Sequence, residues 1–144
     1  MTPSQACIDL IMRSEGCVLT AYEDAAGVWT IGWGHAGSDV YLGSLKWSQE
    51  QADAALQRDL GRASGAVERM VKVPLTQGQF DALVDFTFNL GAGRLASSTL
   101  LKCLNAGRYD DACEHLLRWD HAGHVELTGL KARREAEAEM WRTP

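Results

Sequence analysis

Three side chains with complementary chemistry lie close together near the start of this 144-residue chain. Glu15 carries a carboxyl group that can donate a proton, Asp24 carries a second carboxylate, and Thr30 carries a hydroxyl that can position water. A proton donor, a second carboxylate and a held water molecule are the groups that hydrolysis of a glycosidic bond requires. We therefore expect these three residues to meet at one catalytic site.

The expected role of Glu15 follows from its position in a predicted helix. The pattern over residues 3–14 indicates an amphipathic helix, with Thr2 as its N-cap, Pro3 at the first helical position and Gln5 completing a capping box. Glu15 continues the apolar stripe, so its carboxyl group should be partly desolvated and close to the negative end of the helix dipole. Both effects predict a raised pKa, which suits a general acid; the alternative is a solvated glutamate before a glycine cap.

Asp24 and Thr30 each have an ordinary structural explanation as well. Asp24 opens an Asp-x-x-Gly turn, where the side chain commonly bonds nearby backbone amides. Thr30 lies in a β-type run from Val28 to Ile31, and threonine favours strands. Their combination with Glu15 favours the catalytic interpretation.

This stretch resembles the signature of the phage-type lysozyme (endolysin) family, a group of glycoside hydrolase family 24-like muramidases. That signature runs Glu-Gly-x-x-Leu, Tyr-x-Asp-x-x-Gly and Thr-Ile-Gly-x-Gly-His, and it is matched by Glu15-Gly16, Leu19, Tyr22, Asp24, Gly27, Thr30-Ile31-Gly32 and Gly34-His35. Residues 88–91, 104–107 and 129–134 are also similar, so the resemblance covers nearly the whole chain. One departure is Ala36, where many relatives related to the lambdoid phages have threonine.

The resemblance implies an endolysin that hydrolyses the β-1,4 bond between N-acetylmuramic acid and N-acetylglucosamine in bacterial peptidoglycan, with inversion, and so lyses the host cell. It implies that Glu15 protonates the leaving oxygen, while Asp24 stabilises positive charge at the sugar and holds the attacking water with Thr30. One alternative is a lytic transglycosylase, which cleaves the same bond without water and would leave Thr30 without a task. The other is a catalytically silent glycan-binding module, against which the intact set of three residues argues.

Further residues are expected to support the site or contact the substrate. His35 is predicted to be structural, hydrogen-bonded or paired with a carboxylate, with Gly32 and Gly34 beside it. Sugar contacts are expected at Tyr22, Asn89, Ser98 and Trp119. Four residues of types that can bind metal lie close together in the sequence, but their spacing matches no common zinc site: Cys113, His115, His121 and His124. No metal or other cofactor is therefore expected.

Composition and charge restrict the partners. A net charge of -5 argues against nucleic acid as a partner. No apolar run approaches the roughly 18 residues that span a membrane, and Asp9 and Arg13 interrupt the one candidate secretion signal. We therefore expect a monomer made in the host cytoplasm, and the resemblance implies release to the wall through a separately encoded membrane pore. Free thiols are expected at Cys7, Cys17, Cys103 and Cys113.

The pattern along the chain predicts one domain with a mainly helical α+β, lysozyme-like fold. A β-containing lobe over about residues 15–47 is expected to carry strands at Leu19–Tyr22, Val28–Ile31 and Val40–Leu42, with turns at 37–39 and 43–44. A connecting helix over about 48–71 begins at a capping box of Ser48 and Gln51. Gly61 and Gly65 weaken that helix, so the alternative is two separate core helices.

Residues 72–144 are predicted to form a helical lobe, with helix 3–14 packing on it and the substrate cleft between the two lobes. Helix starts are expected at Thr76 with Gln79, Ser97, Asp110 and Thr128. Helix ends are expected at Gly91 with Gly93 and at Gly107. Residues 120–127 are expected to form a polar loop. The adjacent Trp119 is therefore the best candidate for stacking on a sugar ring.

Overall fold

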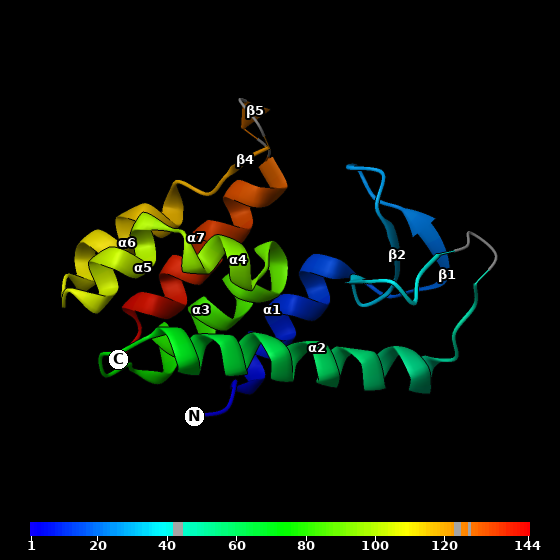
Figure 1. The fold of residues 1–144 in the computed structure, drawn as a ribbon, viewed down its shortest axis with the longest axis horizontal. Coiled ribbons are helices and arrows are strands. Elements are labelled where there is room, and N and C mark those ends of the chain that lie inside the picture. Colours follow the sequence, from blue (N-terminus) through cyan, green and yellow to red (C-terminus); the bar gives the residue numbers. More distant parts are fainter. Residues whose placement is uncertain (42–44, 123–124, 127) are drawn as a thin grey trace. The chain divides into compact units, whose positions relative to one another are not determined.

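The computed structural model describes residues 1–41, 45–122, 125–126 and 128–144, and its mainly helical α+β fold confirms the predicted class (Figure 1). The chain forms two compact units. The smaller unit is Ile11–Arg62, and the larger unit combines Met1–Leu10 with Ala63–Pro144. Two helices, α1 (Gln5–Glu15) and α2 (Gln49–Met70), each run from one unit into the other.

A three-stranded antiparallel sheet lies in the smaller unit, in the order β1 (Val18–Glu23), β2 (Trp29–Gly32) and β3 (His35–Ala36). The first two strands confirm the prediction to within a few residues, but the third was wrong. The chain turns back directly after β2, because Gly34 adopts a φ of 72°, which side-chain-bearing residues rarely take. His35 therefore pairs with Ile31.

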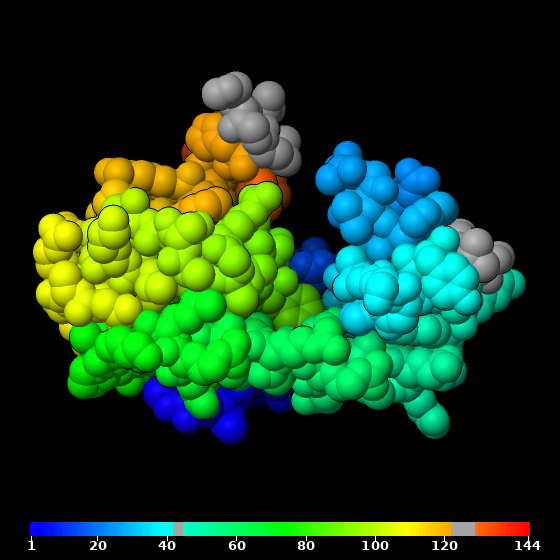
Figure 2. All heavy atoms as spheres, in the orientation of Figure 1, coloured from blue at the N-terminus to red at the C-terminus, as the bar shows by residue number. Residues whose placement is uncertain are grey.

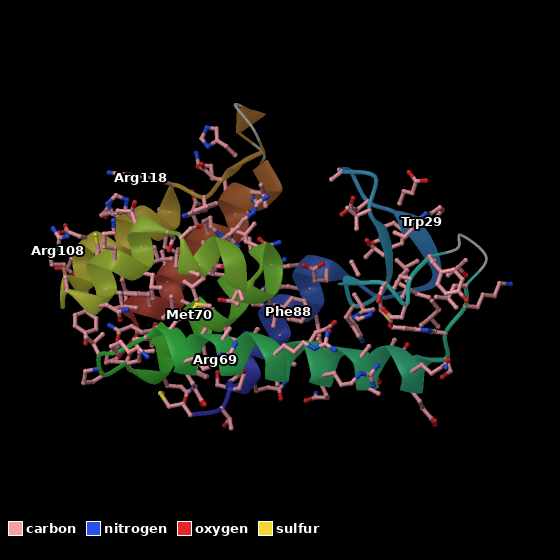
Figure 3. The ribbon with its side chains drawn as sticks, in the orientation of Figure 1. Trp29, Arg69, Met70, Phe88, Arg108 and Arg118 are labelled. Atoms are coloured by element: carbon pink, nitrogen blue, oxygen red, sulfur yellow. The ribbon has the colours of Figure 1, made fainter. Side chains whose placement is uncertain are left out.

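The segment expected to form the third strand instead supplies a core residue. Val40 is buried with Ala21 and Ile31, and Trp29, Leu45 and Trp47 pack against this small cluster. Trp29 is labelled in Figure 3. Leu42 and the turn expected at residues 43–44 lie outside the described residues. A small sheet is marginally stable by itself, so this apolar cluster is what holds β1, β2 and β3 in place.

The helix α2 is continuous from Gln49 to Met70 through Gly61 and Gly65, so the alternative of two separate helices was wrong. Its predicted capping box is confirmed. The backbone N–H of Ser48 donates to Oε1 of Gln51 at 2.8 Å, and the backbone N–H of Gln51 donates to Oγ of Ser48 at 3.1 Å. Each glycine weakens a helix by about 1 kcal/mol. Burial of apolar side chains along the opposite face of α2 offsets this loss of helix stability. The buried residues of that face are Ala52, Ala55, Leu56, Leu60, Ala63, Ala66 and Val67.

The start of α1 differs from the prediction. The helix begins at Gln5, not at Pro3, and Thr2 is not its N-cap. Within the larger unit, the backbone N–H and the hydroxyl of Ser4 both donate to the carboxylate of Asp81. This tertiary contact with Asp81 replaces the local capping box that the sequence pattern favoured.

The helices of the larger unit are α3 (Gln77–Leu90), α4 (Ala92–Ala96), α5 (Thr99–Asn105), α6 (Tyr109–Leu117) and α7 (Thr128–Arg142). Helices α3 and α7 pack together, as do α5 and α6, which appear in yellow-green and yellow in the space-filling view (Figure 2). In the part of the chain that the structure describes, no helix has both the length and the apolar character needed to cross a membrane.

Several helix boundaries in this unit test the sequence predictions. The capping box of Thr76 and Gln79 is confirmed. The cap of α5 is Ser98 and not Ser97, and α6 begins at Tyr109, so Asp110 lies in its first turn. The predicted end of α3 at Gly91 is confirmed, because Gly91 is its C-cap, whereas Gly93 lies within the next helix, α4. The expected loop at 120–127 contains a short ladder of β4 (His121–Ala122) and β5 (Val125–Glu126), and residues 123, 124 and 127 lie outside the described part.

A buried ion-pair network joins α7 to α3. Arg133 donates to both carboxylate oxygens of Asp85 at 2.9 Å, and Nη2 of Arg134 donates to Glu137 at 2.7 Å and to Asn89 at 2.8 Å. Burial and the adjacent Asp85 carboxylate raise the pKa of Glu137. Glu137 therefore keeps its proton to higher pH and can donate it to Asp85, which limits the buried negative charge. The two arginines thus connect α7 with α3.

The cysteines are free thiols, as predicted: Cys7, Cys103 and Cys113 are buried and Cys17 is partly exposed. Burial raises the pKa of Cys7 and Cys113, so neither is a ready nucleophile. We expect lytic activity to be the same with and without a thiol reductant, which parallel turbidity assays would measure. Strong activation or inactivation by the reductant would indicate a regulatory disulfide.

Candidate active site

Glu15 is the last residue of α1, and its side chain is half-buried. Its carboxyl group lies directly over the α-carbon of Gly34 in the turn between β2 and β3. A Cβ atom built on Gly34 would be only 2.1 Å from Oε2 of Glu15. The helix end and the β2–β3 turn therefore position this carboxyl group together.

Asp24 begins the loop that connects β1 with β2. Its Oδ1 accepts hydrogen bonds from the backbone N–H groups of Ala26, at 2.8 Å, and Val28, at 2.9 Å. The backbone N–H of Gly27 closes the turn on the carbonyl oxygen of Asp24 at 2.9 Å. Among the described residues, none donates a hydrogen bond to Oδ2. One oxygen thus fixes the carboxylate in the turn, and the exposed second oxygen is available to a substrate or a water molecule.

Thr30 is buried on β2, with 5% of its surface exposed. Its hydroxyl donates to the carbonyl oxygen of Val28 at 3.0 Å. This bond uses the only hydroxyl proton and leaves the oxygen lone pairs free to accept. Thr30 can therefore orient a water molecule by accepting a hydrogen bond from it.

Tyr22 connects these residues. On β1 it pairs directly with Thr30 on β2. Burial, and after it the negative charges of Glu15 and Asp24, raise the pKa of Tyr22. The negative charges of both carboxylates therefore act on the phenol. The strand pairing places Tyr22 beside Thr30, and Glu15 and Asp24 lie in the same smaller unit.

His35 is buried and bonded at both ring nitrogens. Nδ1 lies 2.7 Å from Oδ2 of Asp59 on α2, and Nε2 lies 3.0 Å from both oxygens of Asp39. Burial disfavours the charged ring, but the hydrogen bonds to Asp59 and Asp39 outweigh it and raise the pKa of His35. Trp47 packs beside the ring, with centroids 5.4 Å apart.

Sequence reasoning anticipated a carboxylate partner for His35 but named neither Asp39 nor Asp59. Asp39 follows His35 by four residues in a predicted turn, so proximity in sequence was a usable signal. Asp59 lies on a separate helix, and no local pattern relates it to His35. Gly32 lies beside this group, where a Cβ atom would come within 3.2 Å of the Trp47 ring.

The charge on His35 predicts a pH-dependent stability. Its folded pKa is raised above the unfolded value of 6.5, so its contribution is complete below that pH and is lost as pH rises through the folded pKa. The hydrogen bond to His35 lowers the pKa of Asp39, whose contribution is lost only as pH falls through the acid range. We expect the free energy of unfolding to decrease above about pH 6.5, measured by urea unfolding at a series of pH values.

The Asp59→Asn variant should show a smaller decrease over the same pH range, because one carboxylate that favours the charged ring is removed. Asp53→Asn serves as the control, since Asp53 accepts from Trp33 and Gln49 and not from His35. An identical pH dependence in the wild type and Asp59→Asn would contradict this account of the His35 charge.

The other expected sugar contacts lie in the larger unit, and each of them contacts another residue of that unit. The amide oxygen of Asn89, which follows Phe88 near the end of α3 (Figure 3), accepts from buried Arg134. The Ser98 hydroxyl donates to Leu95 at 2.7 Å and caps α5. Trp119 packs edge-on against Phe86, with centroids 5.6 Å apart. Ser98 and Trp119 also line a cavity of about 470 Å³ with Arg94, His115, Arg118 and His121.

Within the described residues, no group of three or more histidine, cysteine or acidic side chains is arranged to hold a metal ion. His124, which the sequence grouped with Cys113, His115 and His121, lies outside those residues.

Comparison with known proteins identifies a family for this chain. The phage lysozyme family model matches residues 12–137, a stretch that contains Glu15, Asp24 and Thr30. The endolysin of Bacillus phage B103 is 42% identical over 145 residues, which cover 99% of this chain and 55% of the relative. This chain therefore spans about half the length of that relative.

Two further proteins resemble the chain over nearly their full lengths. The endolysin of Acyrthosiphon pisum secondary endosymbiont phage 1 is 39% identical over 142 residues, which cover 96% of each protein. The solved structure of the endolysin from Escherichia coli O157:H7 phage FAHEc1 is similar with a TM-score of 0.85 and 37% identity. That match covers 99% of this chain and 94% of the other.

Proposed function

Because the chain belongs to the phage lysozyme family of peptidoglycan-degrading glycoside hydrolases, we propose that it is an inverting muramidase in which Glu15, Asp24 and Thr30 carry the reaction. The bond cleaved is the β-1,4 link between N-acetylmuramic acid and N-acetylglucosamine. The observation that supports this assignment most strongly is the position of the Glu15 carboxyl group over Gly34, in the turn that follows the strand carrying Thr30.

In this proposal Glu15 is the general acid. It protonates the glycosidic oxygen as the bond to the anomeric carbon breaks, which avoids the release of an unstable alkoxide. Glu15 is the last residue of α1, and its carboxyl group lies against Gly34 in the turn between β2 and β3, so it is already within the site before the substrate arrives. A proton donor that is already in place contributes typically 10²–10⁴-fold to such a reaction, so ~10³-fold is a reasonable expectation here.

Asp24 and Thr30 act on the opposite side of the bond. The Asp24 carboxylate stabilises the positive charge that develops at the sugar and accepts a proton from the attacking water. Thr30 accepts a hydrogen bond from the other O–H group of that water, because its own hydroxyl proton is donated to the Val28 carbonyl oxygen. Attack on the face opposite the leaving group inverts the anomeric configuration.

The products test this mechanism. Digestion of purified peptidoglycan should give fragments with a normal reducing end, identified by mass spectrometry, and NMR at early times should show the inverted anomer. Anhydro products would instead identify a lytic transglycosylase, and retained configuration would require a covalent intermediate. A chain that binds glycan strands without clearing a wall suspension would be a binding module.

The proposal includes a monomeric enzyme that reaches the wall through a pore formed by a separate protein. Light scattering of the purified chain should give the mass of one copy, which is 15.8 kDa. Bacteria that express the chain alone should remain intact, and bacteria that also express a pore-forming protein should lyse. Lysis by the chain alone would show that it has its own route to the wall.

A further inference from the structure

The backbone of Gly34 forms the surface on which the Glu15 carboxyl group lies. A Cβ atom built on Gly34 would be 2.1 Å from Oε2 of Glu15, 2.7 Å from Cδ and 3.1 Å from Cγ. Real Cβ atoms essentially never come within 3.0 Å of another heavy atom in this way. The carboxyl group therefore occupies the space that a side chain at this position would fill.

Any side chain at position 34 would collide with Glu15 before it met another group. All three atoms nearest to the built Cβ belong to the Glu15 side chain, and none belongs to the backbone. Elsewhere the consequence differs: a Cβ on Gly78 would meet the main-chain carbonyl oxygen of Met140 at 1.9 Å, so there the backbone itself would have to move. At position 34 the flexible Glu15 side chain can rotate away instead.

The segment that contains Gly34 is held in place by contacts of the residues beside it. It connects β2 with β3, and Ile31 pairs with His35 across this turn. His35 is bonded in turn to Asp59 and Asp39, at 2.7 and 3.0 Å. Since these contacts fix the turn, Glu15 is the group that must give way to a side chain at position 34.

We propose that Gly34 is a positioning residue for the general acid, because its missing side chain holds the Glu15 carboxyl group in the orientation needed to protonate the leaving oxygen. This inference rests on the acid role proposed for Glu15. It predicts that Gly34→Ala leaves a folded protein with a displaced acid. A displacement of about 1 Å at a reacting group can reduce turnover about 10²-fold.

The test compares Gly34→Ala with Gly107→Ala. Gly107 has a similar φ of 79° and no atom within 4 Å of its built Cβ, so this control carries the same backbone strain without a collision. We expect kcat on peptidoglycan to fall about 10²-fold in Gly34→Ala with KM nearly unchanged, and Gly107→Ala to retain wild-type kinetics. Thermal unfolding should show a similar loss of stability in both variants.

A second substrate separates loss of the acid from general damage. A β-glycoside of the same glycan with a dinitrophenolate leaving group needs no protonation, because that phenolate is already a stable anion. We expect Gly34→Ala and Glu15→Gln to retain most of their activity on this compound. If Gly34→Ala lost the same fraction of wild-type activity on both substrates, Gly34 would have only a structural role.

Double variants show whether Gly34 acts through Glu15. In a Glu15→Gln background, Gly34→Ala should reduce activity no further, since the acid is already absent. If Gly34→Ala alone does not fold, the collision predicts that Glu15→Ala/Gly34→Ala does fold. A double variant that also fails to fold, or a fully active Gly34→Ala, would overturn the inference. Wall lysis by Glu15→Gln would instead refute the acid role itself.

Discussion

Glu15→Gln should lose wall lysis almost completely, by about 10³-fold or more, because glutamine keeps the shape of the side chain but cannot donate the proton. The change should have little effect on folding, and it removes a negative charge at the unfavourable end of α1. The measurement is clearance of a peptidoglycan suspension, together with the midpoint of thermal unfolding for both proteins.

Glu23→Gln is a suitable control, since it removes an equal charge from an exposed position at the end of β1. It should clear cell walls at nearly the wild-type rate. Lysis by Glu15→Gln at a comparable rate would exclude Glu15 as the acid. The search for a donor would then pass to the remaining groups near Tyr22.

Thr30→Val should reduce turnover by about 10²-fold or more, because valine preserves the shape and the β-propensity but cannot hold the attacking water. Binding of the glycan should survive, so the loss is expected in kcat and not in KM. The variant also leaves the carbonyl oxygen of Val28 without its hydrogen bond from the hydroxyl, which costs about 1 kcal/mol of stability. Steady-state kinetics on solubilised peptidoglycan would measure both parameters.

Two matched variants make this result specific. Thr30→Ser keeps the hydroxyl and should recover much of the lost activity. Thr20→Val makes the same substitution at an exposed position on β1 and should be fully active. If Thr30→Val turned over like the wild type, a held water would no longer be required at this position. The transglycosylase mechanism would then become the better explanation.

The sequence by itself determined the elements whose signals are local. The capping boxes at Ser48 and Thr76 located the starts of α2 and α3, because the two hydrogen bonds of a box need residues only three apart. The first two strands were predicted for the same reason, since Asp24 and Gly27 form the turn that joins them. The order of Glu15, Asp24 and Thr30 along the chain, with the resemblance that it carries, was sufficient to identify the candidate site.

The tertiary structure decided what depends on contacts between distant segments. The bond from Ser4 to Asp81 moved the start of α1, and the tight turn at Gly34 made His35, not Val40, part of the third strand. Asp59 reaches His35 from another helix. The contact between Glu15 and Gly34 also depends on tertiary structure. The end of α1 and the turn between β2 and β3 must pack together before the Glu15 carboxyl group can occupy the space beside Gly34. Sequence patterns indicate which side chains a segment carries, whereas tertiary packing determines which side chains of distant segments they contact.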